Sequence, residues 1–76
     1  ITAPLVGTFY GRPSPDAEPF VSSGDLVQRG DTVCIIEAMK VMNEIKAETP
    51  GRVVDLLLED GAGVEFGQPM ILFERA

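Results

Sequence analysis

The chain has 76 residues, of which 45% are hydrophobic, and its 12 acidic and 6 basic side chains give a formal net charge of −6. A chain of this length forms one small domain, residues 1–76, which buries only about 60% of its unfolded surface. The acidic balance excludes a nucleic-acid-binding protein, which needs a basic face, and no apolar run approaches the roughly 20 residues of a membrane span.

Turn residues divide the chain into short segments, since it has 8 glycines and 6 prolines. No stretch shows helical periodicity, so the pattern predicts an all-β fold. In chain order, we expect strands at residues 2–10, 26–28, 32–38, 41–48 and 52–58, a short strand between Gly61 and Gly67, and a last strand at residues 70–74.

A proline-rich segment follows the first expected strand. Pro13, Pro15 and Pro19 each lack the N–H group that a central strand would donate. We therefore expect residues 11–18 to project as a stiff loop. Two interpretations remain open, a tolerated surface insertion and a rigid flap beside a functional site.

An internal repeat indicates two related halves. Residues 1–7 resemble residues 45–51, and residues 24–37 resemble residues 61–74. The matched pairs are Ile1 and Ile45, Ala3 and Ala47, Gly7 and Gly51, Gly24 and Gly61, Val27 and Val64, Gly30 and Gly67, and Glu37 and Glu74. The two blocks differ in spacing by about seven residues, which the proline-rich loop accounts for. The repeat predicts a small barrel or sandwich with a pseudo-two-fold axis.

Met39 and Lys40 occupy the expected turn between two strands. A two-residue hairpin loop favours positive φ at both central residues, a strained conformation for side chains other than glycine. Turns normally use Gly, Asn, Asp, Pro or Ser, so a Met-Lys turn indicates selection for something outside the fold. A lysine amine is almost entirely protonated near neutral pH and is a weak nucleophile. We therefore interpret Lys40 as an amine that another enzyme modifies.

The hairpin register also separates two faces. With Met39 and Lys40 at the tip, Cys34 and Ile36 fall on a largely apolar face that we expect to point into the core. Val33, Ile35 and Glu37 fall on a mixed face that we expect to meet solvent. Cys34 is then a packed small hydrophobic residue rather than a nucleophile.

Catalysis by the chain itself is not expected. The sequence has no histidine, which removes Ser-His-Asp, Cys-His and His-metal arrangements, and its carboxylates are scattered along turns and strands. We predict no catalytic residue and no metal site. Its single cysteine cannot form an intrachain disulfide and fits a reducing compartment. Because the sequence starts at Ile1 without an initiator methionine, we expect a fragment of a longer protein.

A family resemblance follows from the turn and its surroundings. Residues 37–44, Glu-Ala-Met-Lys-Val-Met-Asn-Glu, resemble the biotin attachment site of biotinyl carrier domains. Residues 7–10 and 13–17 are similar to the start and the thumb loop of the biotin carboxyl carrier proteins of acetyl-CoA carboxylases, and residues 30–36 and 64–69 fit the same pattern. The resemblance covers essentially the whole chain. It implies a flattened β-barrel of two related four-stranded halves, with the lysine on a hairpin turn and a thumb insertion nearby.

The resemblance also implies a function. Biotin would be attached to Lys40 by a biotin protein ligase, with Met39 and Ala38 as candidate contact residues. Biotin carboxylase and carboxyltransferase would then be partners in forming malonyl-CoA for fatty acid synthesis, in the cytoplasm or in the plastid stroma of a plant. The chain would be a non-catalytic carrier. Val41 departs from the family, which frequently has Met at that position.

Three alternatives remain open at this stage. Biotinyl domains of other biotin-dependent carboxylases resemble the core, although many lack the thumb. Lipoyl carrier domains share the fold, but their lysine typically lies between Asp and Ala. A purely structural or protein-binding barrel would leave the Met39-Lys40 turn and the proline-rich loop unexplained.

Overall fold

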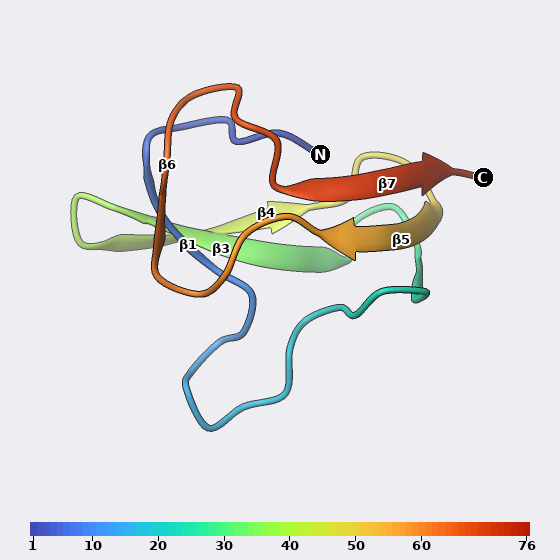
Figure 1. Cartoon of the computed structure of the whole chain (residues 1–76), viewed down its shortest axis with the longest axis horizontal. Helices are drawn as coiled ribbons and strands as arrows, with labels where there is room; N and C mark the ends of the chain where they lie inside the picture. Colours follow the sequence, from blue (N-terminus) through green and yellow to red (C-terminus); the bar gives the residue numbers. More distant parts are fainter.

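The computed structural model describes all residues from Ile1 to Ala76 and confirms the all-β prediction (Figure 1). It contains no helix, and therefore none that is long and apolar enough to span a membrane. The strands are β1 (Gly7–Tyr10), β2 (Leu26–Val27), β3 (Thr32–Ala38), β4 (Val41–Lys46), β5 (Gly51–Leu56), β6 (Ala62–Val64) and β7 (Ile71–Arg75).

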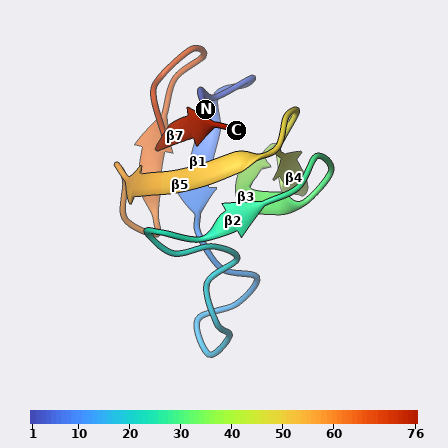
Figure 2. The same ribbon diagram turned by 90° about the vertical axis from the view of Figure 1, so that its right-hand side faces the viewer.

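The strands form two antiparallel sheets. One has the order β4-β3-β1-β6 and the other has the order β2-β5-β7. Figure 2 shows one sheet behind the other, with β5 crossing in front of β1. The molecule is flattened, with principal extents of 33 × 28 × 20 Å. The β3–β4 turn and the C-terminus lie at opposite ends of the long axis (Figure 1).

The expected first strand, residues 2–10, is shorter in the structure. Only Gly7–Tyr10 forms β1, whereas Thr2 makes an isolated bridge to Pro69. The Ala3 N–H donates to the Gln68 carbonyl at 2.9 Å, so the first residues pair beside the segment that leads into β7. Pro4 cannot donate a backbone hydrogen bond, and the chain changes sheets between these two segments. The three-stranded sheet thus gains a short fourth pairing segment beside the start of β7.

The internal repeat is confirmed by matching hydrogen bonds. The Gly30 N–H donates to the Ala47 carbonyl at 2.8 Å, and the Gly67 N–H donates to the Ala3 carbonyl at 2.7 Å. Gly30 and Gly67 have φ values of 92° and 82°, a region that glycine enters without steric cost. The same turn therefore occurs twice, once in each half.

The core lies between the sheets and draws on both halves. Its buried members are Ala3, Phe9, Val21, Val27, Val33, Cys34, Ile36, Ala47, Val53, Val64, Met70 and Ile71. Ala3 and Ala47 are both buried, as are Val27 and Val64, so matched repeat positions occupy matched core positions.

Two residues of the expected solvent-facing side of the hairpin are buried instead. Val33 is 1% exposed because the register shifts between Thr32 and Cys34, and this irregularity turns its side chain into the core. Ile35 is 7% exposed and lies opposite Tyr10 of β1, which pairs with β3 on the side away from β4. The prediction that these two residues meet solvent was wrong, because it considered the hairpin alone.

The proline-rich loop forms no strand, as predicted. We call residues 11–18 the thumb. Its base is closed by the Phe20 N–H donating to the Gly11 carbonyl at 2.9 Å, and its outer end contains a turn in which the Ala17 N–H donates to the Ser14 carbonyl at 3.1 Å. It extends away from both sheets in Figures 1 and 2.

Candidate functional site

The β3–β4 turn places Lys40 at an exposed tip, as the sequence predicts. Ala38 ends β3 opposite Val41 at the start of β4, so Met39 and Lys40 are the two turn residues. Their φ values are 52° and 65°, which confirms the expected positive φ at both positions. Left-handed backbone costs roughly 1–2 kcal/mol per residue outside glycine, so the two arms must hold the turn.

The arms are held by pairing and by burial. Opposed residues run without a break from Ala38 and Val41 down to Cys34 and Ile45. Between them, the Asn43 side-chain amide donates to the carbonyl oxygens of Ile36 and Val41, each at 3.2 Å. Ile36 and Cys34 are fully buried below the turn. A rigid base therefore supports the strained tip.

Apolar side chains surround the lysine. Met39 is 96% exposed, and Val41 and Met42 are 57% and 49% exposed. Exposed apolar groups clustered at one end of a small domain mark a contact surface. Ala38 is half-buried at the end of β3 and adds little bulk beside the turn. The structure thus brings together Ala38, Met39 and Lys40, the three predicted site residues.

A cleft of about 390 Å³ lies between the thumb and the hairpin. Tyr10 and Met42 line it from the sheet, Pro13 and Pro15 from the thumb, and Asp60 from the turn before β6. A volume of a few hundred cubic ångströms is typical of small-ligand sites. Met42 belongs to β4, the arm that follows Lys40, so this cleft adjoins the hairpin that carries the lysine.

Sequence reasoning did not identify the lining residues Tyr10, Met42 and Asp60. One signal was available for Met42, because it lies opposite Glu37 in the hairpin register, on the face that was expected to meet solvent. No comparable signal exists for Asp60, which approaches the thumb only through the fold.

Cys34 is a buried thiol, as expected. It is fully buried in the core, and burial raises the pKa of its thiol to about 12. Only the thiolate is reactive. No group of three or more histidine, cysteine or acidic side chains is arranged to hold a metal ion.

We predict that Cys34 resists thiol reagents while the domain is folded. At pH 8, the native protein should react with Ellman's reagent many times more slowly than the same protein in guanidinium chloride, because both the depressed thiolate population and burial protect the sulfur. Absorbance at a fixed reagent concentration measures both rates. Equal rates would contradict the packed position of Cys34.

These features define a class, a small two-sheet barrel that presents one lysine on a rigid, apolar tip. The chain matches the protein family described as "Biotin-requiring enzyme" over residues 1–73. It therefore belongs to the biotin/lipoyl attachment family, and its fold is that of a carrier domain.

Curated relatives of the chain include biotin carboxyl carrier proteins of acetyl-CoA carboxylase. The chain is 54% identical over 70 residues to the biotin carboxyl carrier protein of acetyl-CoA carboxylase from Chlamydia pneumoniae, covering 92% of the chain and 42% of that relative. It is 50% identical over 74 residues to the protein of that name from Haemophilus influenzae, covering 97% and 48%. A chloroplastic relative from Arabidopsis thaliana is 51% identical over 72 residues, covering 95% and 28%. The chain spans less than half the length of these relatives.

A solved structure shares the fold. A single-chain, multi-domain long-chain acyl-CoA carboxylase matches with a TM-score of 0.84 and 26% identity, over 100% of this chain and 7% of that protein. The flattened two-sheet arrangement is thus that of a domain found within a carboxylase.

Proposed function

We propose that this chain is the biotin carrier domain of an acetyl-CoA carboxylase and that Lys40 is the residue that carries biotin. The strained, exposed Met39-Lys40 turn is the observation that carries this proposal. A turn of two non-glycine residues at positive φ is maintained only where the surrounding structure imposes it. The identity of about 50% to biotin carboxyl carrier proteins across nearly the whole chain supports it.

Attachment requires Lys40 to act as an acyl acceptor. A biotin protein ligase would supply an activated acyl adenylate and a base. The Lys40 Nζ atom then bonds to the acyl carbon, the bond from that carbon to the adenylate oxygen breaks, AMP leaves, and the displaced proton passes to the base. The product is an amide, so the formal net charge of the chain falls from −6 by one unit. Exposed Met39 and small Ala38 would contact the ligase.

Loaded biotin supplies a ring nitrogen that accepts and releases a carboxyl group. The chain itself holds the amide at a fixed vertex and presents it to two partners, biotin carboxylase and carboxyltransferase. Tethering raises the local concentration at both sites. We propose no catalytic residue in this chain, malonyl-CoA as the product of the assembly, and a cytoplasmic or plastid-stromal location.

One reconstitution separates this proposal from its alternatives. The chain, ligase, biotin and ATP are incubated first, and intact mass reports attachment. The loaded chain is then the only biotin source for biotin carboxylase and the carboxyltransferase of acetyl-CoA carboxylase, and malonyl-CoA is measured. A gain in mass without malonyl-CoA would point to another carboxylase, whereas modification by a lipoyl ligase alone would identify a lipoyl domain.

We predict that the thumb restrains a biotin ring on Lys40. Removing residues 12–18 should leave a folded domain that still accepts biotin, because the Phe20 to Gly11 hydrogen bond already brings the loop ends together. The ring should move faster, since the deletion removes one wall of the cleft. Relaxation of ¹⁵N-labelled ring nitrogens measures this motion, with a glycine-serine loop of equal length as the control. Unchanged relaxation would count against the flap interpretation.

A further inference from the structure

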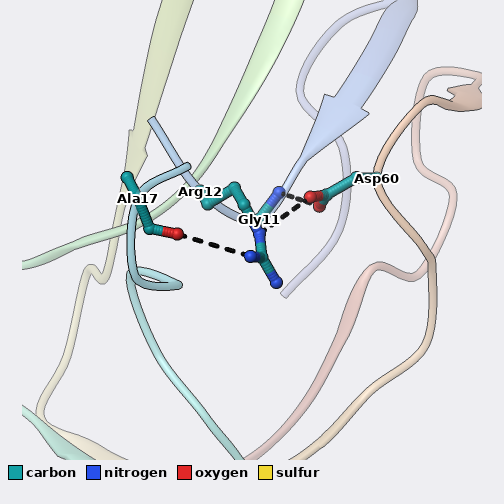
Figure 3. Close-up of polar contacts among 4 residues, drawn as sticks. All are labelled: Gly11, Arg12, Ala17 and Asp60. Carbon is teal, nitrogen blue, oxygen red and sulfur yellow. Dashed lines mark hydrogen bonds and ion pairs between the residues drawn. The ribbon is translucent and has the colours of Figure 1, made fainter. Parts of the chain in front are cut away.

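Asp60 connects the turn before β6 to the start of the thumb. Its Oδ1 atom accepts a hydrogen bond from the Gly11 N–H at 2.7 Å, and its Oδ2 atom lies 3.0 Å from Arg12 Nε in an ion pair (Figure 3). One carboxylate therefore holds the first two residues of the thumb. Hydrogen bonds to an ionised acceptor are stronger than those between neutral groups.

Arg12 carries this attachment further into the thumb. Its Nη1 atom donates to the Ala17 carbonyl at 3.3 Å. The guanidinium thus lies between Asp60 and the returning limb of the loop, as Figure 3 shows. Arg12 therefore acts as a strut across the thumb, joined to Asp60 by the ion pair and to Ala17 by a hydrogen bond.

The position of Asp60 is fixed by the fold. In the same turn, the Gly61 N–H donates to the Phe9 carbonyl at 2.8 Å, and the Ala62 N–H donates to the Glu59 carbonyl at 3.1 Å. The first of these bonds attaches the turn to β1, directly before the thumb begins, and the second closes the turn itself. Asp60 is consequently held by rigid elements while the loop that it contacts has few internal bonds.

The repeat shows that the carboxylate is particular to the thumb side. Ser23 occupies the position in the first half that Asp60 occupies in the second. Its hydroxyl donates to the Val54 carbonyl at 2.7 Å, on a strand that continues without an insertion. Where the chain has no thumb, it uses a neutral hydroxyl donor. Where it has the thumb, it uses a carboxylate that accepts from the Gly11 N–H and forms an ion pair with Arg12.

We propose that Asp60 is a positioning residue that fixes the thumb through Gly11 and Arg12. Asp60 and Arg12 both line the cleft against Tyr10 and Met42, so fixing the thumb also fixes the width of that cleft. Under the proposed function, in which Lys40 carries biotin, the width of the cleft sets how freely the biotin ring moves. The latter step rests on biotin attachment, whereas the positioning of the thumb does not.

The first test uses the chain without biotin. Asp60→Ala should raise the hydrogen-exchange rate of the Gly11 amide by about tenfold, because it removes a charged acceptor, and should lower the ¹⁵N order parameters of residues 12–18. Asp60→Asn retains an acceptor for Gly11 but loses the ion pair, so it should loosen Ala17 more than Gly11. Glu74→Gln is the matched control, since Arg52 and Glu74 form another exposed ion pair at 3.4 Å, between strands β5 and β7.

Global stability distinguishes positioning from general support. The Asp60 and Arg12 side chains are 42% and 38% exposed, and exposed ion pairs contribute little to folding. The melting temperatures of Asp60→Asn and Glu74→Gln should therefore agree, whereas the thumb should be more mobile in Asp60→Asn. Wild-type exchange and order in Asp60→Ala, or equal loosening in Glu74→Gln, would overturn the proposal.

The second test uses the chain loaded with biotin. Ring ¹⁵N relaxation should show faster motion in Asp60→Ala than in Glu74→Gln. Equal ring motion with a loosened thumb would overturn the link to the ring and leave the positioning of the thumb standing. If ligase adds no biotin to the wild-type chain, the proposed function fails, and the first test still decides the role of Asp60.

Discussion

Replacing Lys40 with arginine should abolish biotin incorporation and leave the fold intact. Arginine retains the positive charge and a long side chain, but its guanidinium is always protonated and is an ineffective acyl acceptor. The position is exposed at the turn, so the free energy of unfolding should change by less than about 0.5 kcal/mol. Intact mass after treatment with ligase, biotin and ATP measures incorporation, and circular dichroism confirms the fold.

The chain contains its own control for this experiment. Lys46 is the only other lysine, and it lies at the end of β4 on an exposed face. Lys46→Arg should accept biotin at the wild-type rate, because the strained tip remains unchanged. A biotin-sized gain in mass in Lys40→Arg would disprove the attachment site. Loss of incorporation in both variants would show that recognition extends along β4.

The hairpin could be predicted because residues close together in the sequence determine it. Two strands of alternating pattern meet at two residues, which fixes both the register and the positive φ of Met39 and Lys40. The structure reproduces this pairing from Ala38 and Val41 to Cys34 and Ile45. The repeat could be predicted for a different reason: equivalent turns and core positions in the two halves require similar residues.

Other features depend on contacts between distant segments. Val33 is buried because of a register irregularity that no local pattern marks. Ile35 is covered because β1 pairs beside β3, and Asp60 meets Gly11 across 49 positions of sequence. The division of the first strand at Pro4 could have been anticipated, since a proline inside an expected strand weakens that assignment.

The two glycines that begin β1 and β5 should be the positions least tolerant of a methyl group. A Cβ atom at Gly51 would overlap the Glu74 carbonyl oxygen and the Phe73 ring, and one at Gly7 would overlap the Glu37 carbonyl oxygen. A backbone carbonyl within a sheet cannot move aside without breaking strand pairing. Overpacking of this kind costs about 1–3 kcal/mol. Because domains of this size lose roughly 4–8 °C per kcal/mol, Gly51→Ala should melt about 10 °C lower.

Gly63→Ala separates this steric effect from the general effect of replacing glycine in a strand. Gly63 lies in β6, and no atom lies within 4 Å of the position that its Cβ would take. Alanine there reduces the entropy of the unfolded chain without a clash, so its melting temperature should equal or slightly exceed that of the wild type. Thermal unfolding followed by circular dichroism compares all three variants. Equal melting temperatures for Gly51→Ala, Gly7→Ala and Gly63→Ala would show that close backbone approach does not limit substitution at the two repeat positions. The pseudo-two-fold packing would then be looser than the structure indicates. If both melt lower by similar amounts, the repeat is equivalent in energy as well as in geometry.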